Sequence, residues 1–251
     1  MGDEAGAWVV LTAAGMGTRL GADGPKALVR IGDRTILEFA LERALACPDA
    51  TGVVVTCPEG LEAEFEAATS AVGRAVPVLF VAGGETRQAS VLAGLRAVQE
   101  RAVPGPETPV LVHDAARCLT PPEVFSRLVA AIRGGADAAI PVLPVVDTIA
   151  VVGQATDEDP VGAGASGWRV QETLDRSRLR VVQTPQAFRW DVLFPVHLAA
   201  EARSGAEESA ATDDASLVAE RGIPVQVVEG SPLALKVTVP EDLDRALRFL
   251  D

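Results

Sequence analysis

Short apolar runs alternate with helix-period segments along most of this chain, and that alternation limits the folds open to it. The apolar runs lie at residues 8–11, 53–55, 78–81, 110–113 and 138–142. Segments with apolar residues at helical spacing lie between them, at residues 35–46, 61–70, 85–100 and 122–133. Continuous apolar runs of this length are typical of strands that are buried on both faces of a parallel sheet. The pattern predicts an α/β fold with a single doubly wound, mostly parallel sheet.

The size and composition of the chain fit one domain. Its 251 residues, 48% of them hydrophobic, suffice for a substantial core, so we expect a single domain over residues 1–251. No apolar stretch approaches the roughly 20 residues that a membrane span needs, and the acidic N-terminus lacks a signal-peptide pattern. The three cysteines, Cys47, Cys57 and Cys118, form no C-x-x-C pair. We therefore expect reduced thiols, a cytoplasmic location and no membrane partner.

The net charge of −13 at pH 7 argues against nucleic acid as a partner. A protein that binds nucleic acid needs a basic surface, which this composition does not favour. A phosphorylated small molecule stays possible, because salt screens exposed charges beyond about 10 Å. A few converging cations at a site then outweigh a distant acidic surface.

A glycine-rich loop, AAGMGTRL, follows the first predicted strand at residues 13–20, and Pro25-Lys26 comes shortly after it. Glycines let backbone N–H groups approach an anion closely, and Arg19 and Lys26 add positive charge. The spacing excludes two common phosphate loops. No Ser or Thr follows the lysine as in a Walker A loop, and Leu20 stands where a dinucleotide fingerprint has its third glycine. The glycines alone would fit an ordinary turn, but the two cations favour a nucleotide site.

Two further polar segments follow predicted strands, at the sheet edge where α/β proteins bind ligands. The first is HDAAR at residues 113–117, in which Asp114 could hold Mg²⁺ together with substrate phosphates. Alternatively, Asp114 caps the next segment and Arg117 is a solvated charge. The second is GGETRQAS at residues 83–90, in which glycines allow close approach and Ser90 offers a hydrogen bond. On its own this segment fits a glycine turn before a capped helix equally well.

Together these segments resemble the nucleotidyltransferases that activate sugar and alditol phosphates, and among them the 2-C-methyl-D-erythritol 4-phosphate cytidylyltransferase family. The similarity also includes TPQAF at residues 184–188 and LKVT at residues 235–238, in consistent order from residue 11 to residue 243. It implies a Rossmann-like nucleotidyltransferase fold. It further implies transfer of CMP from CTP to a small alditol phosphate, with release of pyrophosphate and Mg²⁺ as cofactor, in isoprenoid precursor biosynthesis.

The resemblance also implies a role for individual residues. The implied catalytic residues are Arg19, Lys26, Arg176 and Lys236. The implied nucleotide-binding residues are Ala13, Ala14, Gly15, Gly17, Lys26, Gly83, Gly84, Arg87, Ser90 and Ala115. The implied acceptor-binding residues are Asp114, Arg117, Thr148, Arg176, Thr212 and Lys236, with Asp114 also as the metal ligand. For Lys236 the alternative is an exposed lysine at a strand end, and Arg178 and Arg180 compete with Arg176.

The α/β alternation breaks at residues 147–182 and returns with helices from residues 191, 214 and 240 and a strand at 225–228. Strand-like pieces at 148–152 and 168–171 flank a polar stretch and predict a projecting β-arm. Exposed ribbons pair readily at their edges, so the arm is a natural dimerisation device. The resemblance implies a homodimer in which Arg176 completes the partner's site. For the tip, residues 157–167, we favour an insertion without a role.

Two other functions stay open at this point. A ribitol 5-phosphate cytidylyltransferase shares the loop and the HDAAR type of segment, and differs only in its acceptor. A non-catalytic nucleotide-binding module would be expected to carry a degenerate loop, whereas Gly15, Gly17, Arg19 and Lys26 are all present. No nucleophile–base pair indicates a covalent intermediate. His113 fits a structural role better than that of a base, because an ionised phosphate needs no base to attack.

Overall fold

The computed structural model describes residues 6–17, 20–21, 24–154, 167–201 and 213–250. Its centre is an eight-stranded sheet in the order β10-β7-β11-β6-β1-β4-β5, with β12 also paired to β7. Two of these strands, β10 (Arg180–Val182) and β11 (Gln186–Arg189), are short and antiparallel to their neighbours. Six of its strands run parallel to one another: β1 (Ala7–Thr12), β4 (Ala50–Cys57), β5 (Val78–Ala82), β6 (Pro109–Asp114), β7 (Ala138–Pro144) and β12 (Val225–Glu229). The predicted α/β fold with a mostly parallel sheet is confirmed.

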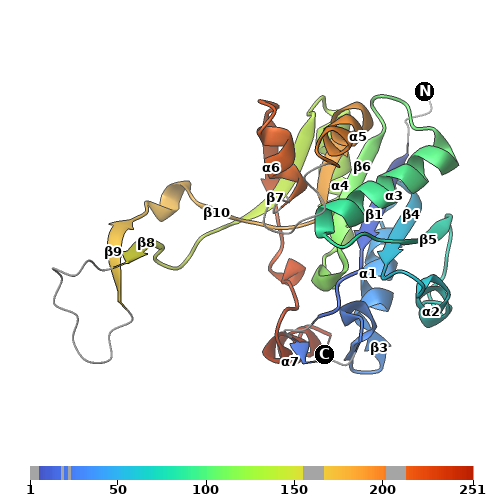
Figure 1. Cartoon of the computed structure of the whole chain (residues 1–251), viewed down its shortest axis with the longest axis horizontal. Coiled ribbons are helices and arrows are strands. Elements are labelled where there is room, and N and C mark those ends of the chain that lie inside the picture. The colour runs from blue at the N-terminus through green and yellow to red at the C-terminus, as the bar shows by residue number, and fades with distance from the viewer. Residues whose placement is uncertain (1–5, 18–19, 22–23, 155–166, 202–212, 251) are drawn as a thin grey trace.

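Helices cover both faces of this sheet (Figure 1). They are α1 (Ile36–Leu45), α2 (Glu62–Ala68), α3 (Arg87–Ala102), α4 (Pro122–Arg133), α5 (Trp190–Ala199), α6 (Asp214–Ala219) and α7 (Pro240–Leu247). Each lies where the helical spacing or a start signal predicted it. The capping box that begins α1 is formed, because Thr35 Oγ1 accepts a hydrogen bond from Glu38 N at 3.1 Å and Glu38 accepts one from Thr35 N at 2.7 Å.

The two faces of the sheet carry separate hydrophobic cores. Val9 and Leu11 of β1 pack into the core beneath α1 and α4, whereas Trp8 and Val10 point into the core beneath α3, α5 and α6. Successive strand residues point to opposite faces, so a continuous apolar run fills both cores at once. This is why the central strands show no polar alternation in the sequence.

One central strand was not predicted. The sequence pattern indicates no strand at the TPQAF segment, but Gln186–Arg189 form β11, antiparallel between β6 and β7. The strand is only four residues long and follows Pro185, so it is too short to carry a periodic signal. Ala187 and Phe188 are fully buried in it. The short strands β2 (Arg30–Ile31), β3 (Arg34–Thr35) and β10 (Arg180–Val182) escaped prediction for the same reason.

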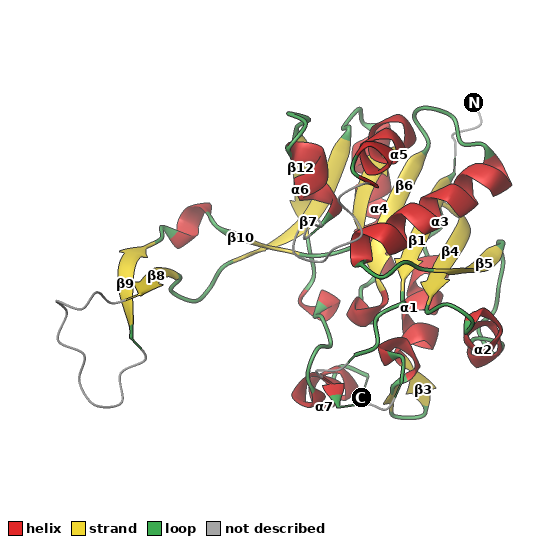
Figure 2. Cartoon of the chain, viewed as in Figure 1, coloured by secondary structure: helices red, strands yellow, loops and turns green. Residues whose placement is uncertain are grey.

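The predicted arm strands are present. The β8 strand (Ala150–Gln154) pairs antiparallel with β9 (Trp168–Thr173), and the ribbon projects away from the sheet (Figures 1 and 2). Nearly all of its side chains are exposed, including Trp168 and Val170. Most of the predicted tip, residues 157–166, lies outside the described residues.

Cys47, Cys57 and Cys118 are free thiols, and all three are buried. Within the described ranges, none of the helices combines the length and the apolar character that crossing a membrane demands.

Candidate active site

A cleft of about 580 Å³ opens at the carboxyl ends of the parallel strands. Its walls come from the loop after β1, the turn after β5, the segment after β6 and the segment that precedes α7. The structure brings ten of the residues singled out in the sequence into its lining: Ala13, Ala14, Gly15, Lys26, Gly84, Arg87, Ser90, Asp114, Ala115 and Lys236. Segments far apart in the sequence therefore meet at one sheet edge.

The loop after β1 folds back onto the segment that carries Lys26. The backbone N–H of Lys26 donates to the Gly15 carbonyl at 3.1 Å. Gly17 has a φ of +67°, and a Cβ at this residue would lie 2.6 Å from Lys26 Cβ. Only glycine tolerates both the left-handed conformation and this close approach. Gly17 thus shapes the loop without lining the cleft, and Arg19 lies outside the described residues.

Ser90 organises the glycine turn after β5. Its hydroxyl accepts a hydrogen bond from Gly84 N at 3.1 Å and donates to the Thr86 carbonyl at 2.9 Å. Gly83 needs to be a glycine, because a Cβ there would lie 2.8 Å from Ala14 Cβ. The Ser90 hydroxyl, a predicted nucleotide-binding group, is therefore hydrogen-bonded within the turn itself, which packs against the loop after β1.

Asp114 is the centre of charge in the cleft. Its Oδ1 accepts a hydrogen bond from Arg87 Nε at 2.9 Å, and its Oδ2 accepts one from Lys236 Nζ at 2.8 Å. Burial alone would raise the Asp114 pKa, but the two cations outweigh it and hold that pKa well below its usual range. The carboxylate makes no capping bond to the segment that follows, so the capping alternative is wrong.

Arg117, which is predicted to bind the acceptor, contacts a backbone carbonyl close to Lys236. It does not line the cleft, and its Nη1 donates to the Ala234 carbonyl at 2.7 Å. A second bond, from Val237 N to the Ala116 carbonyl at 2.9 Å, ties the same two segments together. In this structure Arg117 therefore fixes the segment that presents Lys236, and its predicted contact with the acceptor stays a prediction.

His113 is fully buried beneath the cleft. Its Nδ1 lies 3.0 Å from Thr184 Oγ1, and that same hydroxyl accepts a bond from Asp114 N at 3.0 Å. Burial is the main cause that lowers the His113 pKa to about 3, so the imidazole is neutral near pH 7. These contacts agree with the structural role expected for His113 and show how Thr184 fixes the backbone at Asp114.

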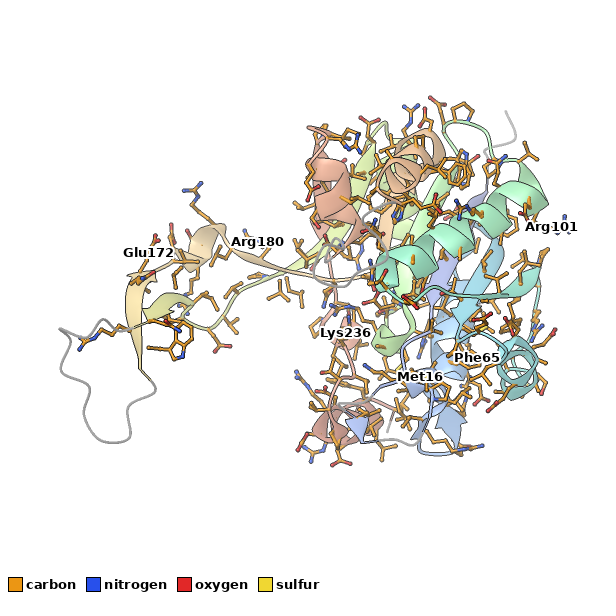
Figure 3. All side chains as sticks on the ribbon, in the orientation of Figure 1. Met16, Phe65, Arg101, Glu172, Arg180 and Lys236 are labelled. Carbon is orange, nitrogen blue, oxygen red and sulfur yellow. The ribbon has the colours of Figure 1, made fainter. Side chains whose placement is uncertain are left out.

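The structure does not bring the predicted arm residues into the cleft of their own chain. Thr148 and Arg176 lie at the arm, and the Arg176 guanidinium donates to the Val146 carbonyl at its base. In Figure 3 Glu172 lies out on the arm, far from Lys236 on the body of the molecule. Thr212, the remaining predicted contact, lies outside the described residues.

The sequence interpretation missed one functional candidate. Asp214 is buried beside the cleft, and its Oδ2 accepts a hydrogen bond from Arg87 Nη1 at 2.8 Å. The sequence did contain a signal for this role. Two adjacent acidic residues stand at the start of α6, and only one of them is needed as the N-cap of the helix. Asp213 is that cap, with its carboxylate accepting from Ser216 N at 2.9 Å. The second acid was therefore available for another role.

A glycine-rich phosphate loop and a converging set of Lys, Arg and Asp side chains, at the carboxyl edge of an α/β sheet, define a nucleotide-binding protein with charges suited to phosphoryl chemistry. The chain matches the family model described as "IspD: 2-C-methyl-D-erythritol 4-phosphate cytidylyltransferase" over residues 7–251. The chain belongs to this family.

Curated relatives agree with the family match. A 2-C-methyl-D-erythritol 4-phosphate cytidylyltransferase of Nocardia farcinica is 40% identical over 251 residues, covering 99% of this chain and 96% of the relative. A bifunctional enzyme IspD/IspF of Clavibacter michiganensis subsp. michiganensis is 44% identical over 240 residues, covering 95% of this chain. The match spans 53% of that bifunctional relative, so this chain corresponds to about half of its length.

Solved structures share the fold. The 2-C-methyl-D-erythritol 4-phosphate cytidylyltransferase of Thermus thermophilus is 36% identical with a TM-score of 0.69, covering 96% of this chain and 97% of that one. A 4-diphosphocytidyl-2C-methyl-D-erythritol synthase is 27% identical with a TM-score of 0.75, covering 99% and 100%. The interpretation as a nucleotidyltransferase of this family is confirmed, and it is favoured over the ribitol 5-phosphate enzyme and the non-catalytic module.

Proposed function

We propose that the chain transfers CMP from CTP to 2-C-methyl-D-erythritol 4-phosphate and releases pyrophosphate. The observation that carries the proposal is the meeting of Lys26, Arg87, Asp114 and Lys236 in one cleft beside a glycine-rich loop. The acceptor is the one that the names of the Nocardia and Thermus relatives state.

The chemistry is an in-line displacement at the α-phosphorus of CTP. An oxygen of the acceptor phosphate forms a bond to that phosphorus, and the bond to the bridging oxygen of pyrophosphate breaks. The attacking phosphate is already ionised, so the step needs no base. Negative charge builds on the leaving and non-bridging oxygens, and Lys26 stabilises it together with Arg19. The protein otherwise contributes the alignment of the two substrates.

The turn after β5 is the proposed contact for the cytosine and ribose. Backbone groups of Gly83 and Gly84 are fixed by the Ser90 hydroxyl and packed against Ala14, so they reach a ligand without rearrangement. A preorganised turn costs little conformational entropy when the nucleotide binds. We propose that this arrangement selects the small pyrimidine over a purine.

Asp114 is the proposed ligand of Mg²⁺. No three acidic, His or Cys side chains cluster as a metal site in the part of the chain that the structure describes. Mg²⁺ in such enzymes takes one or two carboxylates together with substrate phosphates, and the ionised Asp114 at the cleft suits this chemistry. Oδ1 accepts bonds from Arg87 and from Thr12 Oγ1, whereas Oδ2 accepts one from Lys236 and keeps its second lone pair for a cation. The ion would neutralise charge on the triphosphate.

We further propose that the enzyme is a homodimer in which the arm completes the partner's site. A two-stranded ribbon is at best marginally stable in water, yet β8 and β9 expose apolar side chains such as Trp168, Val152 and Val170. A second copy of the chain would cover them. Arg176 would then bind the acceptor phosphate at the partner's cleft, with Arg178 and Arg180 as alternatives, because none of the three lines the cleft of its own chain.

The deciding experiment combines purified chain, Mg²⁺ and one nucleotide with one acceptor at a time, and follows pyrophosphate release. We expect turnover with CTP and 2-C-methyl-D-erythritol 4-phosphate, and at least tenfold less with ATP, GTP or ribitol 5-phosphate. Equal turnover with a purine nucleotide would contradict the cytidylyltransferase assignment. Faster turnover with ribitol 5-phosphate would keep the chemistry and replace the acceptor.

A further inference from the structure

The Arg87 guanidinium bridges two buried carboxylates that come from different elements of the fold. Its Nε donates to Asp114 Oδ1 at 2.9 Å, and its Nη1 donates to Asp214 Oδ2 at 2.8 Å. Side chains of both carboxylates are almost inaccessible, at 10% and 2% exposure. Burial alone would lower the Arg87 pKa, but the two carboxylates outweigh it and raise that pKa, so Arg87 stays charged. The bridge joins the end of β6 to the start of α6 through the first residue of α3.

Side chains of α5 and β11 hold the Asp214 end of this bridge. His197 Nε2 of α5 lies 2.9 Å from Asp214 Oδ1. Next to it, Gln186 of β11 accepts a bond from Ala215 N at 3.0 Å and donates to Asp213 Oδ2 at 2.9 Å. The Asp214 carboxylate is therefore a fixed anchor, because Gln186 of the sheet holds the backbone of α6 and His197 of α5 holds the carboxylate itself.

The third nitrogen of the Arg87 guanidinium, Nη2, indicates how Arg87 could turn if Asp214 did not hold it. Nη2 is buried and has no hydrogen-bond partner among the described residues. In a guanidinium, Nη2 lies on the same side as the Nε proton, and this pair forms the bidentate contact with a single carboxylate. Without Asp214, Arg87 could turn so that Nε and Nη2 engage both oxygens of Asp114. That contact would compete with Lys236, which now occupies Asp114 Oδ2 at 2.8 Å.

We infer that Asp214 is a positioning residue for the cleft: it holds Arg87 so that one oxygen of Asp114 remains available to Lys236 and to substrates. This inference rests on the proposed function, and it concerns a residue that touches no substrate. Loss of a positioning contact of this kind typically costs about 10²-fold in rate when it moves a reacting group by roughly 1 Å.

A double-mutant cycle tests the inference in the full-length enzyme. The variants are Asp214→Asn, Arg87→Ala and the two together, and kcat and KM are measured for each substrate by pyrophosphate release. Asp214→Asn should lower kcat/KM for the acceptor by roughly 10²-fold. The double variant should fall within about threefold of Arg87→Ala alone, because Asp214 acts only through Arg87. Losses that multiply, or wild-type kinetics in Asp214→Asn, would overturn the inference.

Two further variants separate positioning from folding. Arg87→Lys keeps the charge but cannot span both carboxylates with a fork, so it should lose as much activity as Asp214→Asn. Full activity in Arg87→Lys would also overturn the inference, even if Asp214→Asn did not fold. Glu201→Gln removes the partner of Arg96 in an exposed ion pair with a 2.8 Å distance, and it should leave the kinetics unchanged. Thermal melts of every variant report folding directly.

The cycle also distinguishes this inference from the proposed function. An inactive wild-type enzyme with CTP and 2-C-methyl-D-erythritol 4-phosphate would count against the function. In that case calorimetric titration with CTP alone still compares the variants. Weaker binding by Asp214→Asn, with no further loss in the double variant, would support the positioning role, and unchanged binding would overturn it.

Discussion

Lys236 Nζ lies 2.8 Å from Asp114 Oδ2, although 122 positions separate the two residues in the sequence. The pair is unequal, because the lysine side chain is 42% exposed whereas the Asp114 side chain is only 10% exposed. A flexible, exposed ammonium can exchange one anion for another at little cost. Lys236 is therefore placed to leave the carboxylate for an incoming phosphate, while Asp114 stays fixed by Arg87.

Lys26 should be essential for turnover. Removing a preorganised charge from a transition state typically costs about 10²–10³ in rate, so Lys26→Ala should lose at least that much in kcat. Pyrophosphate release measures the loss, and the melting temperature should stay close to wild type. Arg101→Ala, at an exposed cation on the last turn of α3, is the control and should change neither quantity. Near wild-type turnover in Lys26→Ala would remove this residue from the mechanism.

Ser90 should matter for nucleotide affinity through the turn that it holds. Ser90→Ala removes the acceptor of Gly84 N and leaves that group without its partner. A hydrogen bond of this kind contributes about 0.5–1.5 kcal/mol, so CTP binding should weaken by up to roughly tenfold. Isothermal titration with CTP measures the change, and Ser70→Ala, at an exposed serine, is the control. Equal affinity in both variants would show that the turn keeps its shape without the hydroxyl.

Mixed dimers should reveal whether the arm serves the partner. Lys26→Ala and Arg176→Ala enzymes should each be nearly inactive. After subunit exchange, each heterodimer carries both defects in one site and none in the other if Arg176 acts across the interface. Random pairing then restores about a quarter of wild-type activity. If Arg176 serves its own chain, every site keeps one defect and no activity returns.

The stability of the protein should fall in mild acid because of His113. The pKa of this residue is lowered to about 3 in the folded state, chiefly by burial, against about 6.5 in an unfolded chain. The unfolded state therefore binds the extra proton first. The resulting stabilisation is complete above about pH 6.5 and is lost as pH falls toward 3, with a slope of at most about 1.4 kcal/mol per pH unit.

Urea titrations at pH 7.5, 6 and 4.5 measure this slope. His113→Asn keeps a hydrogen-bonding group for Thr184 but cannot take up the proton, so its free energy of unfolding should depend less steeply on pH. Asp114 does not affect this comparison. Because its pKa is lowered in the folded state, its contribution to the free energy of unfolding is lost only below about pH 4. Equal slopes for wild type and His113→Asn would contradict the prediction.

Local signals in the sequence predicted much of this fold, because they depend on near neighbours. The box at Thr35 and Glu38 and the apolar run of β1 are examples, since one turn or one strand contains the whole cause. The strand Gln186–Arg189 could not be found in this way. This segment is a strand because it forms backbone hydrogen bonds with both β6 and β7. The residues of these two strands lie more than forty positions away in the sequence.

The residues of the cleft show the same difference between local and long-range causes. Motif residues such as Gly15 and Lys26 could be placed from their order along the chain. The contacts of Asp214 and Arg117 could not, because each is settled by a partner about 117 or more positions distant. A charged residue has no preferred partner in the sequence, so its role appears only when the tertiary structure shows which opposite charge or carbonyl it meets.

The base of the arm is closed by its own strand pairing. Pro144 of β7 lies opposite Arg180 of β10, so the chain returns to the sheet beside the point where it left. The segment between these two residues lies outside the central sheet, so its length can change without altering the pairing of β7 with β10. Under the proposed assembly, the core of the molecule selects the nucleotide and the arm of the partner selects the acceptor. The arm can therefore change in length or sequence to suit a new acceptor without disturbing the nucleotide site.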